Sequence, residues 1–304
     1  MIKKGNLIVI AGPTAVGKTS LAVEVARYFN TEILSADSRQ FYREMQIGTA
    51  RPTVTEKQGI PHHFTGHLSI KEEYNVSAFE RDALQLLDKL FQTHENVIMV
   101  GGSGLYINAV CHGIDELPDP DPDLRKRLQN DLETKGIESL QQELQRLDPN
   151  YYTQVDKNNP KRLMRGIEVC MTTGRKYSEM RTQARKERPF NILKIGLNLD
   201  REKLFQRISH RTDKMVEEGL VEEARRLYPY RQLNALNTVG YKEIFRYLDG
   251  EISLEQAVTD IKTSTRRYAK RQLTWFKKDP EIQWLSPFQW EEIVTFVQRN
   301  QVKG

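Results

Sequence analysis

The sequence has few cysteines and lacks long apolar runs. Cys111 and Cys170 are the two cysteines among 304 residues, and they follow no metal-ligand spacing, so they indicate a reducing compartment. No stretch approaches the ~20 apolar residues that cross a bilayer, so we expect no membrane association. The apolar run at residues 7–11 follows two lysines but leads straight into a glycine turn, which predicts a strand rather than a signal peptide. We therefore expect a cytoplasmic protein.

Acidic residues are scarce in two segments, although the net charge of +5 is mild. Residues 161–190 hold nine lysines and arginines against three acids, and residues 262–278 hold seven against none. Such blocks are typical of proteins that bind a polyanion, but either block alone also fits a solvated helix face. Because both accompany the phosphate-binding motif described below, we favour nucleic acid as the partner.

Strand and helix patterns alternate in most of the chain. Four apolar runs predict buried parallel strands at residues 7–11, 32–36, 97–100 and 192–199. Helical patterns separate or follow these runs, and this alternation predicts an α/β fold with a doubly wound parallel sheet, as in the P-loop NTPases.

The composition changes at residues 115–123, where three prolines and five acids predict a linker. The pattern from there to residue 190 is helical, and we expect helices to begin at Pro122 or Asp123 and at Pro160. We therefore predict an α/β core over residues 1–114 and 191–304, with an inserted helical domain over 115–190. After Asp200, a predicted helix cap, the C-terminal region is largely helical.

The segment GPTAVGKT matches the P-loop pattern G-x-x-x-x-G-K-[ST] in full. Its two glycines permit backbone conformations that direct N–H groups at phosphate oxygens, and the following helix adds its positive end. The lysine supplies a point charge, and the last threonine can ligate Mg²⁺. The predicted phosphate-binding residues are Gly12, Pro13, Thr14, Ala15, Val16, Gly17, Lys18 and Thr19.

An acid is missing where nucleoside triphosphate hydrolases hold Mg²⁺. The strongest later strand ends in Gly101-Gly102-Ser103-Gly104, which offers glycines and a hydroxyl instead. Asp37 is the acid at the end of an early predicted strand, and the carboxyl ends of such strands carry the chemistry of α/β sheets. We expect Asp37 near the mouth of the P-loop and free for another task, unless it or Ser38 only caps a helix over residues 39–45.

Several motifs, taken in order, resemble the bacterial tRNA dimethylallyltransferases, which are tRNA isopentenyltransferases. They are GPTAVGKT, SADSRQFY, QIGTARP, PHHF, GGSGLY, NNPKRLMRGIEV, VGYKE and TRRYAKRQLTWF. Apart from the P-loop, each motif is weak alone, but the ordered set is specific and covers residues 7 to about 276. The chain has no Cys/His cluster after Cys170 and so resembles the bacterial form rather than eukaryotic relatives with a zinc finger.

The resemblance implies transfer of a dimethylallyl group from dimethylallyl diphosphate to N6 of the adenosine 3′-adjacent to the anticodon, with release of pyrophosphate. The P-loop, with Mg²⁺ at Thr19, would stabilise charge on the leaving diphosphate. Asp37 would be the base that N6 needs. Arg211 would reach the diphosphate, but Arg207 lies one turn away on the same helix face and is an equal candidate. The catalytic candidates are therefore Asp37, Thr19 and Arg211.

The resemblance also assigns contacts with the tRNA anticodon stem-loop. The target base must be flipped out before N6 can react, and the family draws it into a channel while the inserted domain grips the loop. We expect a monomer. The residues that align with tRNA contacts of the family are Asp37, Ser38, Arg39, Gln40, Ser103, Lys161, Arg162, Leu163, Met164 and Arg165.

Three other functions share part of these features. A small-molecule kinase would use the P-loop and Asp37 as base, but it would need the missing acid and leaves the basic insertion unexplained. A transferase that acts on a free adenine nucleotide would not need the insertion. An RNA-binding P-loop module without enzymatic activity would tolerate the loss of Asp37.

Two segments allow more than one interpretation. His62, His63 and His67 could suggest a metal site, but adjacent histidines rarely face one ion, so we expect none. Residues 265–276 interleave basic and aromatic side chains as RNA-binding surfaces do, but helical spacing would equally place the aromatic residues in the core.

Overall fold

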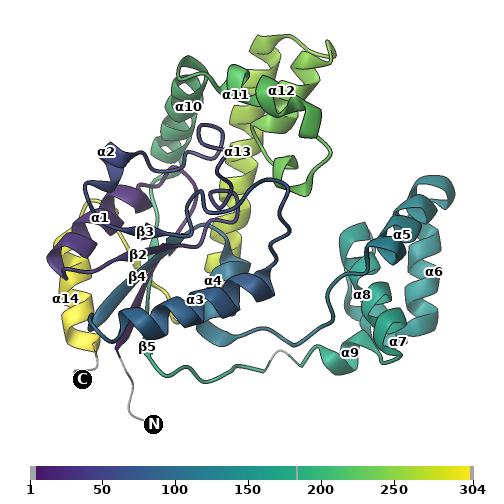
Figure 1. Ribbon diagram of the computed structural model, residues 1–304, viewed down its shortest axis with the longest axis horizontal. Coiled ribbons are helices and arrows are strands. Elements are labelled where there is room, and N and C mark those ends of the chain that lie inside the picture. Colours follow the sequence, from purple (N-terminus) through teal and green to yellow (C-terminus); the bar gives the residue numbers. More distant parts are fainter. Residues whose placement is uncertain (1–4, 183, 302–304) are drawn as a thin grey trace. The chain divides into compact units, whose positions relative to one another are not determined.

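The computed structural model describes residues 5–182 and 184–301 and divides into two compact units (Figure 1). The first unit combines Met1–Cys111 with Glu187–Gly304, and the second is His112–Lys186. The insertion predicted at 115–190 thus differs from the second unit by a few residues at each end. The chain leaves the first unit once and returns to it.

The first unit contains a six-stranded sheet in the order β3-β2-β4-β1-β5-β6, in which all paired strands are parallel. The predicted α/β class is confirmed, and so are the four predicted strands. The two further strands lie at the sheet edges, and neither forms part of a continuous apolar run. The strands are β1 (Asn6–Ala11), β2 (Ile33–Ser35), β3 (His62–His63), β4 (Asn96–Gly101), β5 (Asn191–Leu197) and β6 (Gln283–Leu285).

Helices cover both faces of this sheet. Side chains alternate along β1, so Leu7 and Val9 pack with α3 and α4, whereas Ile8 and Ile10 pack with α1 and α14. None of the helices in the described residues is long and apolar enough to cross a membrane. The helices of the first unit are α1 (Lys18–Tyr28), α2 (Val54–Lys57), α3 (Val76–Leu90), α4 (Gly104–His112), α10 (Arg201–Glu217), α11 (Leu220–Leu227), α12 (Tyr241–Leu248), α13 (Leu254–Phe276) and α14 (Trp290–Asn300).

The helices α10 to α13 pack around a hydrophobic core that is separate from those on the two faces of the sheet. Figure 1 shows these helices in green. Asp200 caps α10 as predicted, because its carboxylate accepts the N–H groups of Glu202 and Lys203. Met45 in the loop after β2 and Ile70 in the loop after β3 also belong to this core, so both loops pack on the helices.

A buried carboxylate holds the loop after β2 in place. Glu223 on α11 is 2 % exposed, and it accepts hydrogen bonds from the backbone N–H groups of Gln46, Ile47 and Gly48 at 2.9 to 3.0 Å. The Tyr241 hydroxyl donates a further bond to it at 2.6 Å. A Cβ on Gly48 would lie 2.6 Å from the Tyr241 ring, so this contact requires glycine. The motifs QIGTARP and VGYKE therefore meet at one carboxylate.

The second unit is helical, as predicted, and has its own core around Leu140, Leu144 and Leu163. Asp121 caps the helix that begins at Pro122, so Pro122 rather than Asp123 opens it. Its helices are α5 (Pro122–Lys135), α6 (Ile137–Leu147), α7 (Pro149–Gln154), α8 (Pro160–Thr173) and α9 (Tyr177–Met180).

Replacing Tyr241 with Phe should lower the free energy of unfolding by about 1.5–3 kcal/mol, because the buried Glu223 carboxylate loses one hydrogen-bond donor. Urea denaturation measures this change. Tyr230→Phe is the matched control, since Tyr230 is 40 % exposed, and it should change stability by less than about 0.5 kcal/mol. Equal stability of Tyr241→Phe and the unaltered protein would contradict the assignment.

Candidate active site

The loop between β1 and α1 closes around the ammonium of Lys18. Lys18 Nζ donates hydrogen bonds to the carbonyl oxygens of Gly12 and Pro13 at 3.1 and 2.7 Å. Gly12 and Gly17 have φ of 151° and 108°, which L side chains rarely adopt, and a Cβ on Gly12 would lie 2.7 Å from the Leu197 carbonyl oxygen. Gly17 directly precedes α1, so the loop presents the positive end of a helix, where anions bind readily.

Two other segments hold this P-loop at Thr14. The Thr14 hydroxyl accepts a hydrogen bond from Arg211 Nη2 at 2.6 Å, and its backbone N–H donates to Gln272 Oε1 at 2.8 Å. Arg207 reaches the other side of the loop, because its guanidinium would lie 3.4 Å from a Cβ on Gly17. The sequence could not choose between the two arginines, and the structure brings both to the P-loop.

These elements enclose a cavity of about 450 Å³ within the first unit. Its basic side chains are Lys18, Arg207, Arg211 and Lys214, whereas Asp37 is one of two acids lining it. The excess of positive charge suits an anionic ligand. The other lining residues are Thr14, Ala15, Gly17, Thr19, Ser20, Ser35, Gln40, Thr49, Ala50, Pro52, Glu56, Gln58, His62, Thr65, Val100, Gly101 and His210.

The cavity changes the ionisation of its central lysine. Burial lowers the pKa of Lys18 from 10.5 to about 8, Asp37 opposes this shift, and Arg211 adds to it. Burial also lowers the pKa of Arg211, against the effect of Asp37. A bound anion would favour the charged form of both side chains.

Asp37 follows β2 and lies half-buried in the cavity wall. The alternative that it only caps a helix is wrong, because residues 38–45 form turns and no helix. Its Oδ1 accepts the N–H of Arg39 at 3.1 Å. Beside it, the Ser38 N–H donates to Ser103 Oγ at 3.1 Å, which joins the turn after β2 to the end of β4.

Glycines at the end of β4 leave no room for an acid. A Cβ on Gly101 would overlap the carbonyl group of Ala36, and a Cβ on Gly102 would overlap the side-chain amide of Gln272. A side chain at Gly101 is therefore excluded by backbone, whereas one at Gly102 would require the Gln272 side chain to move. This explains in physical terms why the acid of a nucleoside triphosphate hydrolase is absent from this strand.

A protein-family model described as IPP transferase matches residues 40–279. The chain belongs to this family. The tRNA dimethylallyltransferase 1 of Bacteroides fragilis is 49 % identical to it over 295 residues, 97 % of this chain and 98 % of that protein. The tRNA dimethylallyltransferase of Christiangramia forsetii is 54 % identical over 278 residues, 91 % of this chain and 92 % of that protein. The family indicated by the sequence motifs is thus confirmed.

Solved structures of the family agree with the fold of this IPP transferase. The full-length tRNA isopentenylpyrophosphate transferase of Bacillus halodurans superposes with a TM-score of 0.72 at 37 % identity, over 97 % of this chain and 96 % of that one. A eukaryotic dimethylallyltransferase acting on tRNA superposes with a TM-score of 0.78 at 29 % identity, over 97 % of this chain and 77 % of that one.

Two of the side chains predicted to contact tRNA also form hydrogen bonds with the protein backbone. Gln40 Nε2 donates to the carbonyl oxygens of Thr49 and Ala50 at 3.2 and 3.1 Å. The Arg39 guanidinium donates to the backbone carbonyls of residues 234 and 235 at 2.8 and 3.0 Å. Gln40 thus holds the cavity wall at residues 49 and 50, whereas Arg39 ties the turn after Asp37 to the segment at 234–235.

The motif KRLMR in the second unit divides between surface and core. Lys161 and Arg162 are exposed at the start of α8. Leu163 and Met164 are 0 % and 8 % exposed, so the expectation that their side chains contact tRNA needs correction. Arg165 is partly buried, and its guanidinium donates to a backbone carbonyl, that of residue 118, at 2.8 Å.

The helix α13 fits both interpretations of residues 265–276, the core-packing one and the RNA-binding one. Phe276 is buried, and Tyr268 and Leu273 are partly buried, whereas Arg267 and Arg271 are exposed. Burial raises the pKa of Tyr268 to about 12, and the neighbouring charge of Asp37 adds to the rise. One face of the helix thus packs against the site, and the other is basic and exposed.

The three histidines do not converge. His63 Nε2 lies 2.5 Å from a Glu32 carboxylate oxygen, and His62 Nδ1 lies 2.8 Å from the carbonyl oxygen of Ile60. His67 packs edge-on against aromatic rings, which include that of Phe41. Each ring has a separate structural contact.

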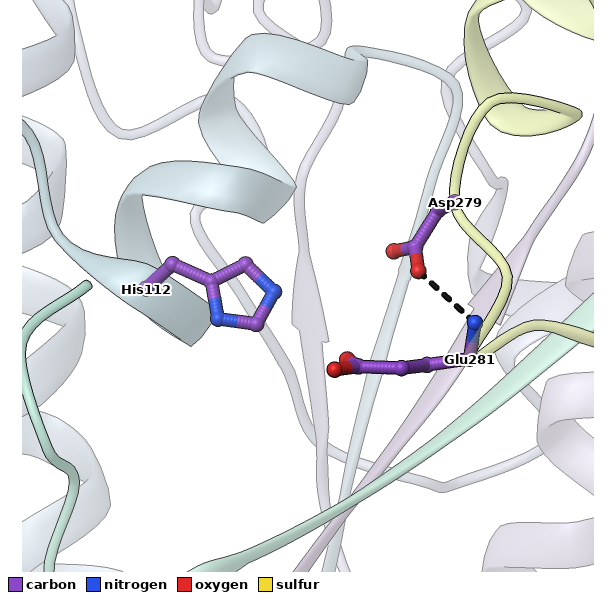
Figure 2. A group of neighbouring side chains, drawn as sticks. All are labelled: His112, Asp279 and Glu281. Carbon is purple, nitrogen blue, oxygen red and sulfur yellow. Dashed lines mark hydrogen bonds between the residues drawn. The ribbon is translucent and has the colours of Figure 1, made fainter. Parts of the chain in front are cut away.

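A pair of carboxylates follows α13, as Figure 2 shows. The Glu281 N–H donates to Asp279 Oδ1 at 3.0 Å, drawn as the dashed line. The ammonium of Lys194 on β5, which is buried, lies 2.7 and 2.8 Å from the carboxylates of Asp279 and Glu281. These acids therefore compensate a buried lysine, and this is sufficient to explain their proximity.

Sequence reasoning missed Gln272, Glu223 and Tyr241. Gln272 and Tyr241 lie within quoted motifs, but Gln272 and Glu223 bind backbone groups far away in the chain, and Tyr241 binds the Glu223 carboxylate. The available signal was helical spacing, because Gln272 lies three positions after Ala269 and four before Phe276 and so shares a face with them.

The affinity for inorganic pyrophosphate should fall as the pH rises from about 8 to 9.5, by up to about tenfold per pH unit, because the free site loses the Lys18 charge. Lys18→Met serves as the control: the ratio of its dissociation constant to that of the unaltered protein cancels the ionisation of pyrophosphate itself. Isothermal titration calorimetry gives both constants. A ratio that stays constant over this pH range would contradict the assignment.

Proposed function

We propose that this IPP transferase transfers a dimethylallyl group from dimethylallyl diphosphate to N6 of the adenosine 3′-adjacent to the anticodon in tRNA, with release of pyrophosphate. One observation carries the proposal: Asp37 shares a basic cavity with the P-loop, while glycine packing removes the acid that phosphoryl transfer would need. The names of the relatives support it.

The P-loop side of the cavity would bind the diphosphate. Lys18 and the N-terminus of α1 meet its charge, and Arg207 and Arg211 flank it. As the carbon–oxygen bond breaks, both electrons go to the leaving diphosphate, and these preorganised groups stabilise the added charge. The Thr19 hydroxyl lines the same wall and is a ligand that Mg²⁺ accepts, so Thr19 would hold the ion, which when bound would neutralise part of the diphosphate charge.

The Asp37 side would receive adenine. N6 is a weak nucleophile because its lone pair is delocalised into the ring, so it must lose a proton while the new carbon–nitrogen bond forms. Asp37 accepts that proton, and the Arg39 N–H orients its carboxylate. Ser103 and Tyr268 lie beside Asp37 and would border the adenosine.

The remaining basic surface would bind the tRNA anticodon stem-loop. Lys161 and Arg162 are exposed on the second unit, and α13 presents a basic face on the first. We propose that the protein acts as a monomer. A tRNA substrate and two free, buried cysteines support action in the cytoplasm.

Labelled dimethylallyl diphosphate should transfer its label to unmodified tRNA, whereas γ-labelled ATP should label no small molecule and free AMP should accept nothing. Label from ATP on a metabolite, with tRNA inert, would restore the kinase alternative. Asp37→Asn should lower the transfer rate by about 10²–10⁴-fold, because the base is lost. Its affinity for tRNA should stay within about threefold. A nearly normal rate would show that Asp37 is not the base.

Lys161→Ala with Arg162→Ala should weaken tRNA binding, because two phosphate contacts are lost. The slope of log K against log salt concentration should become shallower by about 1.4 to 1.8. Filter binding at several salt concentrations measures it, and pyrophosphate affinity should not change. Arg146→Ala in the same unit is the control, since Arg146 pairs with Glu143. A slope that matches the control would remove these residues from the interface.

A further inference from the structure

We propose that Gln272 on α13 is a positioning residue that fixes the distance between the diphosphate-binding loop and the turn that carries Asp37. The inference rests on the proposed function, in which these two segments hold the donor and the acceptor. Nothing in the P-loop pattern requires such a residue, because it comes from a helix more than 250 positions further along the chain.

Both ends of the Gln272 amide are used. Its Oε1 accepts the N–H of Thr14 at 2.8 Å, and its Nε2 donates to the carbonyl oxygen of Gly102 at 2.9 Å. The residue is 6 % exposed. A Cβ on Gly102 would overlap Nε2, so the fit between the two residues depends on a glycine. One planar amide therefore joins the P-loop to the end of β4.

The two partners belong to opposite sides of the reaction. Thr14 also binds Arg211, and it lies in the loop that meets the diphosphate. Gly102 directly precedes Ser103, whose hydroxyl accepts the N–H of Ser38 beside Asp37. A movement of Gln272 would thus shift the P-loop relative to the turn at Asp37 without removing any group that contacts either substrate.

This geometry predicts how loss of the Gln272 amide affects substrate affinity and the transfer rate. Each substrate binds mainly to one side, so its affinity depends little on the spacing between the sides. Attack of N6 on carbon requires the two atoms to approach within about 3–3.5 Å, and a misplacement of about 1 Å can cost 10²-fold in rate. Loss of the amide should therefore reduce turnover far more than binding.

The chemistry of the amide gives two informative substitutions. Gln272→Met keeps the length of the side chain and removes both hydrogen bonds. Gln272→Glu keeps an acceptor for Thr14 but turns the donor towards Gly102 into a second acceptor. Thr265→Val is the matched control, because Thr265 is another buried polar residue on α13 and does not line the cavity.

Single-turnover transfer to tRNA and separate equilibrium titrations with pyrophosphate and tRNA test the inference. Both Gln272 variants should transfer at least about 30-fold more slowly, with both dissociation constants within about threefold of the unaltered enzyme. The melting temperature shows whether a variant folds. If neither Gln272 variant folds, Gly102→Ala disturbs the same contact from the other side. It should likewise lower the transfer rate while leaving both dissociation constants nearly unchanged.

Three outcomes would overturn the inference. The first is a Gln272→Met rate within about threefold of that of Thr265→Val. The second is a loss of rate matched by an equal loss of pyrophosphate affinity, which would make Gln272 a support of the P-loop alone. The third is an unaltered enzyme that transfers no label, in which case the proposed function fails and this inference with it.

Discussion

The close approach of β4 to its neighbours is the constraint on which the rest of the site depends. Gly101 packs on the Ala36 carbonyl, and Gly102 packs on the Gln272 amide. Because no side chain separates them, the ends of β1, β2 and β4 open into one cavity, as the parallel order of the sheet allows. The same packing leaves glycine at the end of β4, where a nucleoside triphosphate hydrolase carries an acid.

The charge in the cavity follows from this assembly. Lys18 is held by two carbonyl oxygens of its own loop, and burial lowers its pKa to about 8. Two arginines add further positive charge, and the nearby Asp37 offsets only part of it. Such a site gains most from a ligand whose negative charge increases during the reaction. A leaving diphosphate has this property, whereas a neutral ligand would gain nothing from these groups.

Local patterns predicted the parts of the fold that depend on neighbouring residues. The P-loop, the four predicted strands and the cap at Asp200 each have a signal within a few positions of sequence. β3 consists of two histidines and β6 of the residues QWL, so neither forms part of a continuous apolar run as the equally short β2 does. Gln272 and Glu223 were missed because their partners are backbone groups that only the folded chain brings near them. The sequence predicted tRNA contacts for every residue of KRLMR, but the helical spacing of this motif buries Leu163 and Met164.

The division into two units separates two physical tasks. The residues that line the cavity all belong to the first unit. The second unit has a separate core and an ion pair between the buried Glu168 and the half-exposed Arg125, and its Lys161 and Arg162 are exposed at the start of α8. Surface charge can therefore serve a polyanion without cost to either core. A large RNA substrate requires this separation, because its affinity comes from many dispersed phosphates, whereas the reaction requires a few groups held at fixed distances.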